Sequence, residues 1–124
     1  MALNLYTEII LDLYKHPRNK GVLENPTHEH FNNNPLCGDE IKIQLILEKN
    51  KIKFVKFQGQ GCAISQASAS LLTDKIMNLN LEEVKKISKD DILEMLHIPI
   101  SPARLKCALL SLETLRGALE NGTK

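Results

Sequence analysis

Residues 41–72 decide the fold, and they read IKIQLILEKNKIKFVKFQGQGCAISQASASLL. In residues 41–47 apolar side chains alternate with polar ones, a period of two that predicts a strand with one buried face. A polar turn, Glu48-Lys49-Asn50-Lys51, leads into a second β-rich run at residues 52–57, so the two runs predict an antiparallel hairpin. The apolar side of the second run changes parity after Phe54, which indicates a β-bulge or a stronger twist.

A helix is predicted directly after this hairpin. Gly59-Gln60-Gly61 ends the second strand, and the stretch that follows, residues 62–77, is rich in Ala, Ser and Leu, which suits a helix packed closely on the sheet. Apolar spacing and cap residues predict further helices at residues 6–16, 81–87, 90–96 and 101–119, and a short strand at residues 28–32 within a loop. Strands early and helices late predict a single α+β domain over residues 1–124, with helices on one face of a small antiparallel sheet of about three strands.

Composition excludes several classes of protein. Hydrophobic residues make up 43% and charged residues 25% of the chain, the balance of an ordinary soluble globular protein. The formal charge of +1 is too small for the basic surface that nucleic acid requires, so no nucleic acid partner is expected. No apolar run approaches the ~20 residues that span a bilayer and no targeting segment is evident, so we expect no membrane association and a cytoplasmic location. Three cysteines without a C-x-x-C pair favour metal or thiol chemistry over disulfides.

The first motif with chemical potential is Cys37-Gly38-Asp39, which leads into the first strand of the hairpin. Glycine permits a tight turn, and such a turn can direct the thiol and the carboxylate at one point. Taken alone, the motif fits an ordinary structural turn equally well.

The second and third cysteines stand in different surroundings. Cys62 follows the glycine loop at a predicted helix start, where unpaired backbone N–H groups and the helix dipole favour a thiolate. Cys107 lies in the first turns of the last helix, with Arg104 and Lys106 beside it. Each cysteine has a plainer interpretation as a buried small residue, and for Cys107 in an Ala- and Leu-rich helix that interpretation is the stronger one.

Together these segments resemble a known family. With 24 residues between Cys37 and Cys62 and 44 between Cys62 and Cys107, they are similar to the IscU/NifU N-terminal scaffold family over nearly the whole chain. Residues 59–72, GQGCAISQASASLL, resemble the second-cysteine motif of the family and are the most specific part. His16-Pro17-Arg18-Asn19 resembles the N-P-R-N segment after the opening helix of the family, with His16 where Asn is usual.

The resemblance implies an α+β fold of the IscU/SufE type, in which Cys37, Asp39, Cys62 and Cys107 gather at one exposed end and bind a metal or a cluster. It implies a scaffold and not an enzyme, which takes sulfur from a cysteine desulfurase of the IscS, SufS or NifS kind. Iron and sulfur then form a labile [2Fe-2S] cluster that passes to apo iron-sulfur proteins, and zinc occupies the cluster-free form. Cys37 and Cys107 are the candidate persulfide acceptors. Clusters are more often held by four thiolates, and a hard carboxylate oxygen in place of one sulfur weakens the hold and permits release.

Two segments differ from IscU proper. Lys106 stands where a His usually precedes the third cysteine, and Ile98-Pro99-Ile100-Ser101-Pro102-Ala103 replaces the Leu-Pro-Pro-Val-Lys segment that a dedicated chaperone recognises, which argues against that chaperone as a partner. The segments around Cys62 and Cys107 look more like SufU, although the insertion usual in SufU between these two cysteines is missing. The alternative function is therefore a SufU-like zinc-dependent sulfurtransferase.

Other interpretations remain open from sequence. A thiol hydrolase would need a Cys–His pair, and none is evident. His28, His30 and His97 are expected to be solvated loop histidines and not metal ligands. The resemblance leaves the native metal and the oligomeric state undetermined, and an oligomer is compatible with it.

Overall fold

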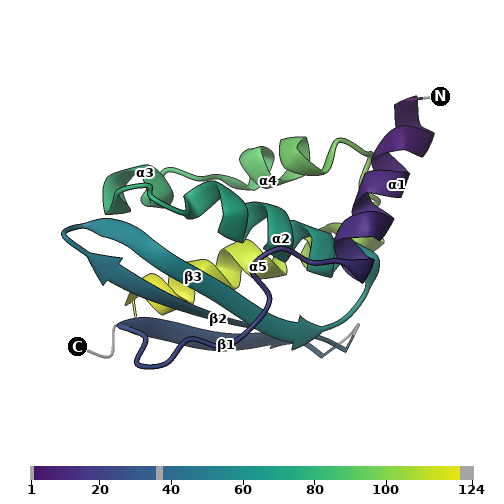
Figure 1. Cartoon of the computed structure of the whole chain (residues 1–124). Coiled ribbons are helices and arrows are strands. Elements are labelled where there is room, and N and C mark those ends of the chain that lie inside the picture. Colours follow the sequence, from purple (N-terminus) through teal and green to yellow (C-terminus); the bar gives the residue numbers. More distant parts are fainter. Residues whose placement is uncertain (1, 36–37, 121–124) are drawn as a thin grey trace.

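The computed structural model describes residues 2–35 and 38–120 and gives an α+β fold (Figure 1). The strands form one antiparallel sheet in the order β1-β2-β3, and the helices lie on one side of it, so the predicted fold class is confirmed. Along the chain the elements are α1 (Ala2–Lys15), β1 (His28–Asn34), β2 (Asp39–Glu48), β3 (Lys51–Gln60), α2 (Ala63–Ile76), α3 (Leu81–Lys85), α4 (Lys89–Leu96) and α5 (Pro102–Glu120). No helix in these residues has both the length and the apolar character needed to cross a membrane.

The predicted hairpin and its bulge are both present. Lys49 and Asn50 connect β2 to β3 with φ values of 52° and 66°, the left-handed conformation that two-residue hairpin turns require. The strand register shifts where Ile46 pairs with Phe54 but Leu47 pairs with Ile52, so Lys53 is an extra residue in β3. As a result Phe54 lies on the outer face and is 51% exposed, whereas the apolar residues before and after it are buried.

Helix α2 is the centre of the core, because it packs against β3, α1, α4 and α5. All of residues 65–70 are buried, so this part of the helix has no solvent face. Small side chains allow neighbours to approach a helix from every side, which explains why five of these six residues are Ser or Ala. Large apolar side chains of the neighbouring elements and of the later turns of α2 fill the remaining space; among those almost fully buried are Ile41, Ile43, Leu45, Ile52, Val55, Phe57, Leu72, Ile76, Leu112 and Leu115.

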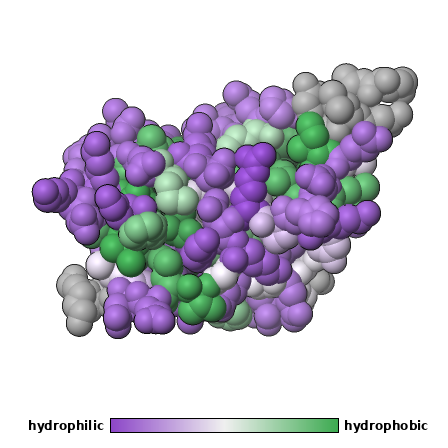
Figure 2. All heavy atoms as spheres, viewed as in Figure 1, coloured by the Kyte–Doolittle hydropathy of each residue, from purple (hydrophilic) through white to green (hydrophobic). Residues whose placement is uncertain are grey.

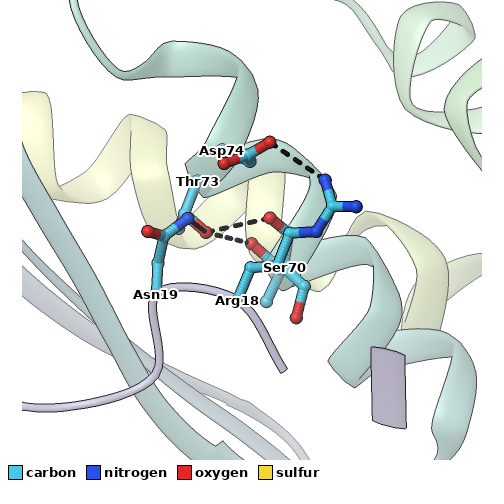
Figure 3. A network of polar contacts seen from close by, with 6 residues as sticks. Arg18, Asn19, Ser70, Thr73 and Asp74 are labelled. Atoms are coloured by element: carbon cyan, nitrogen blue, oxygen red, sulfur yellow. Dashed lines mark hydrogen bonds and ion pairs between the residues drawn. The ribbon is translucent and has the colours of Figure 1, made fainter. Parts of the chain in front are cut away.

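The segment after α1 is tied to α2 by side chains (Figure 3). Arg18 forms an ion pair with Asp74 at 3.1 Å, and the Asn19 amide donates to the Thr73 hydroxyl at 3.2 Å. Thr73 in turn donates to the carbonyls of its own helix, one of which belongs to Ser70. The Arg-Asn pair of the opening motif is therefore a structural anchor that fixes the chain between α1 and the sheet.

After this anchor, the chain covers one edge and part of the outer face of the sheet. The Gly21 N–H donates to the Phe57 carbonyl and the Phe57 N–H donates to the Asn19 carbonyl, each at 2.9 Å, so the free edge of β3 is covered. The chain then crosses the outer face of the sheet, where the Leu23 N–H donates to Gln44 Oε1 at 2.9 Å. Gln44 is buried by this crossing although it points away from the helices.

The face seen in Figure 2 is mostly hydrophilic, with hydrophobic atoms near α1 and over part of the sheet. Large hydrophobic side chains that remain exposed include Ile9, Leu11 and Tyr14 on α1 and Phe31 on β1. Side chains cap the N-termini of two short helices: Asn80 caps α3 and Ser88 caps α4. Each forms a capping box with the third residue of its helix.

We predict that Gln44→Ala lowers the free energy of unfolding by about 0.5–1.5 kcal/mol, because the half-buried Leu23 loses the acceptor of its N–H. The same amide donates to Glu29 Oε1 at 3.0 Å, and this bond holds the pKa of Glu29 below its usual value. Urea unfolding measures the loss. Gln58→Ala on β3 is the control, since the Gln58 side chain makes no hydrogen bond within the described residues, and an equal effect of the two substitutions would contradict the anchoring role.

Candidate metal centre

Three elements bring one functional side chain each to the same end of the molecule, on the right in Figure 1. Asp39 is the first residue of β2, Cys62 is the N-cap of α2, and Cys107 lies near the start of α5. One carboxylate oxygen and the two sulfur atoms all lie within 4.8 Å of one another. These residues line a pocket of about 400 Å³ whose other walls are Gly61, Ala103 and Arg104.

The Asp39 carboxylate is the most constrained group of the site. It is 1% exposed, and its Oδ1 accepts a hydrogen bond from the Cys62 N–H at 3.0 Å. Its Oδ2 is buried and has no hydrogen-bond partner among the described residues. Because an uncompensated buried carboxylate oxygen is unfavourable, Oδ2 is the atom that a bound cation would satisfy.

Gly61 is required by this arrangement. A Cβ atom at this position would lie 2.3 Å from Asp39 Oδ1 and 2.8 Å from the Ser65 hydroxyl oxygen. Ser65 is fully buried and donates to the Cys62 carbonyl at 3.1 Å, so it closes the other side of the loop. The glycine before the second cysteine therefore lets the carboxylate come close enough to bond the backbone of Cys62.

The two cations near Cys107 are placed differently. Arg104 is exposed and lines the pocket with the two thiols and the carboxylate. Lys106 is also exposed but lines a separate hollow with Asn33, Pro35 and Glu113. Arg104 is therefore the cation at the mouth of the candidate centre.

The histidines do not belong to the metal-binding group found in the described residues. His28 and His30 lie in β1, which confirms the short strand predicted at residues 28–32. They were expected to be solvated but are half-buried, because their strand pairs with β2. Burial lowers the pKa of His28. His30 packs against Gly117 of α5, where a Cβ would meet the imidazole ring, and His97 ends α4 in a left-handed conformation.

The structure brings together three of the four residues singled out in the sequence. Asp39, Cys62 and Cys107 form one group, while the fourth, Cys37, lies outside the described residues. Cys62 is half-buried and Cys107 is 1% exposed, and neither forms a disulfide with another described residue. Sequence reasoning missed the contact that makes Gly61 necessary; the small residues on both sides of Cys62 were the available signal.

The donor set fits a thiophilic metal ion. A tetrahedral zinc site has Zn–S bonds of about 2.3 Å, so its ligand atoms are separated by about 3.5–3.8 Å. The separations of up to 4.8 Å found here need only a small closure. The unsatisfied Asp39 Oδ2 and the two sulfur atoms supply three donors, which leaves one tetrahedral position for a further ligand.

Residues 5–123 match the family model of the NifU-like N-terminal domain. The chain therefore belongs to this family, as its resemblance to IscU and NifU indicated. Two curated relatives carry more particular names. It is 38% identical to the zinc-dependent sulfurtransferase SufU of Bacillus subtilis, over 90% of this chain and 86% of that protein. It is 36% identical to the iron-sulfur cluster assembly scaffold protein IscU of Thermotoga maritima, over 94% and 93% of the two chains.

A solved structure agrees with this assignment. A crystal structure from the thermophile Fervidobacterium islandicum AW-1, described as a proposed iron-sulfur cluster assembly scaffold protein for the SUF system, superposes with a TM-score of 0.77. The two sequences are 34% identical, over 90% of this chain and 94% of that one. The three-stranded sheet with its helical layer is therefore the fold of this family.

We predict that Gly61→Ala lowers the free energy of unfolding by about 1–3 kcal/mol more than Gly21→Ala, because the new methyl group displaces the carboxylate that accepts from Cys62. The two glycines have similar φ values, 156° and 158°, so the backbone strain that alanine introduces is similar in the two variants and cancels in the comparison. At Gly21 a Cβ would meet only a Lys56 methylene at an ordinary 3.6 Å. Urea unfolding of both variants measures the difference, and equal losses would contradict it.

Proposed function

We propose that this chain is an iron-sulfur cluster assembly scaffold, a single domain that receives sulfur, assembles a labile [2Fe-2S] cluster and passes it to apo-proteins. The observation that carries the proposal is the group of Asp39, Cys62 and Cys107, with its unsatisfied carboxylate oxygen, in a pocket at one end of the sheet. The relative named as an IscU scaffold, matched over almost the full length of both chains, supports it. The cluster is cargo in this proposal and not a resident cofactor.

Cys37 is the proposed fourth ligand. It precedes Asp39 by two residues, so the covalent chain keeps their Cα atoms within about 7 Å of each other. Three thiolates and one carboxylate would then surround the cargo. A cluster is more often held by four thiolates, and the harder carboxylate oxygen binds it less strongly. That difference suits a protein whose cluster must leave.

Sulfur is proposed to arrive from a cysteine desulfurase. An acceptor thiolate attacks the terminal sulfur of the persulfide on the donor, the S–S bond of the donor breaks, and the donor thiolate leaves. The transfer consumes no electrons, and the acceptor cysteine now bears the persulfide. Reduction of that sulfur and the supply of iron are separate steps that need an external electron donor and ferrous iron.

Zinc-dependent sulfur transfer is the second candidate function. It is favoured by the 38% identity to a relative named a zinc-dependent sulfurtransferase and by a donor set that zinc accepts as a tetrahedral site. The same four residues would then hold zinc and accept sulfur without building a cluster. Zinc is also proposed for the cluster-free scaffold, because three thiolates and a carboxylate repel one another without a cation.

Anaerobic purification and reconstitution test the proposal. We predict one tightly bound divalent metal per cluster-free chain, since structural zinc sites bind with an apparent ~10–16 kcal/mol at neutral pH. Adding desulfurase, cysteine, ferrous iron and a reductant should then produce visible sulfur-to-iron absorption that moves to an apo-ferredoxin. The Cys62→Ser variant is the control and should lose both signals.

The outcomes separate the two candidates. Retained zinc with persulfide but no visible absorption would assign the chain to sulfur transfer. Absence of both a bound metal and a cluster, in protein whose three thiols all react freely, would contradict both functions.

We predict that the persulfide forms on Cys37 and not on Cys107. The 1% exposure of Cys107 supports this choice, because an acceptor thiolate must reach the sulfur of a partner protein. Cys62 is tied into the start of α2 through its backbone and is better suited to holding metal. Each Cys→Ser variant is mixed with desulfurase and cysteine, and mass spectrometry of alkylated peptides locates the added sulfur. Full labelling of Cys107 in the Cys37→Ser variant would contradict the assignment.

A further inference from the structure

Two buried serines connect the helices that carry the cysteines. Ser68 of α2 and Ser111 of α5 are both fully buried, and their hydroxyl oxygens lie 2.8 Å apart. The Ser68 hydroxyl also lies 2.7 Å from the carbonyl oxygen of Ala108, to which it donates. Ser68 therefore makes a direct bond to the backbone of α5 at the residue that follows Cys107.

We propose that this hydroxyl pair is a positioning device that holds Cys107 at its working distance from Cys62 and Asp39. The inference rests on the proposed function, because it assumes that these three residues bind one metal or cluster. Neither serine touches the pocket, so both would act through the backbone of α5.

The need for such a device follows from where the ligands come from. Asp39 and Cys62 are joined by a 3.0 Å hydrogen bond, so their relative position is set locally. Cys107 comes from another helix, and its distance from the pair depends on how α5 lies against α2. Apolar contacts between helices are not directional and tolerate a small slide, whereas a hydrogen bond to a carbonyl fixes distance and direction.

Other buried hydroxyl groups in the same helices do not have this role. Thr114 donates to the carbonyl of Leu110 in its own helix, at 2.7 Å. The hydroxyl of Ser70 is buried and has no hydrogen-bond partner among the described residues. Ser68 differs from both because its bonds cross from one helix to the other.

These differences provide matched controls. The test variant is Ser68→Ala with Ser111→Ala, which removes both hydroxyl groups together and leaves no unpaired partner hydroxyl. Ser70→Ala makes the same substitution in the same helix without removing a bond. Thr114→Val removes a buried hydrogen bond within α5. It therefore controls for a loss of stability that leaves the position of Cys107 unchanged.

The first measurement is binding of Co²⁺, whose absorption reports the number of sulfur ligands and the geometry around the ion. Loss of an interaction that orients a metal ligand typically lowers affinity about 10–100-fold. We therefore expect the double variant to bind Co²⁺ at least about tenfold more weakly, with shifted absorption bands, while both controls match the unmodified protein within about twofold.

The second measurement needs no metal, so it separates this inference from the proposed function. In a Cys37→Ser background, the Cys62–Cys107 disulfide is equilibrated with oxidised and reduced glutathione; two protein thiols are oxidised as one glutathione disulfide is reduced to two glutathione molecules. The equilibrium constant reports how closely the two sulfur atoms are held. We expect it to fall about fivefold in the double variant, the effect of losing one net hydrogen bond, and to stay unchanged in the controls.

If the unmodified protein binds no Co²⁺ but the glutathione equilibrium shifts as expected, the proposed function fails and the positioning role stands. If the double variant matches Ser70→Ala in the glutathione equilibrium, the positioning role is overturned. Should the double variant not fold, Ser68→Ala alone removes the bond to the Ala108 carbonyl and is judged by the same two measurements.

Discussion

The arrangement of the site depends on one hydrogen bond, from the Cys62 N–H to Asp39 Oδ1. It joins the start of β2 to the start of α2, two points that are 23 residues apart in sequence. A buried carboxylate needs such a partner, and the first N–H groups of a helix need an acceptor, so each satisfies a requirement of the other. The absence of a side chain at Gly61 follows from this bond, because any side chain there would occupy the place of the carboxylate. Asp39 is thus both a helix-capping residue and a proposed ligand.

A second constraint comes from the position of α2. Because sheet and helices surround residues 65–70, all but Gln66 are small in this stretch, and three of them are serines. Small side chains allow close approach but fill little volume and provide few directional contacts. Serine hydroxyl groups restore directionality where they find a partner on the next helix, as Ser68 does. The small residues that let neighbouring elements approach α2 closely therefore also include the serine that bonds to α5.

The elements could be predicted because their signals are local. A period of two, a polar turn and a Pro or Gly at each boundary are properties of a few consecutive residues, and they located the hairpin, the bulge and the start of α2. The contact of Leu23 with Gln44 and the burial of His28 could not be predicted in this way, since both arise from a segment that crosses or pairs with a distant strand. The family resemblance singled out Asp39 and the cysteines, of which the structure brings Asp39, Cys62 and Cys107 together. It did not indicate which oxygen of Asp39 is unsatisfied, because that depends on which oxygen accepts from the Cys62 N–H in the folded chain.

The chemistry of the proposed centre follows from the difference between its carboxylate ligand and its sulfur ligands. With Oδ1 bonded to the backbone, the unsatisfied Oδ2 is the oxygen that Asp39 would offer, a single hard donor among soft sulfurs. Three thiolates and a carboxylate carry four negative charges, so a divalent ion leaves two uncompensated, and the cation at the pocket mouth is Arg104. Its guanidinium is exposed, and water and salt weaken its attraction for those charges. A site with one mismatched donor and a screened counter-charge holds its cargo less firmly than four buried thiolates would, which is the property that assembly followed by release requires.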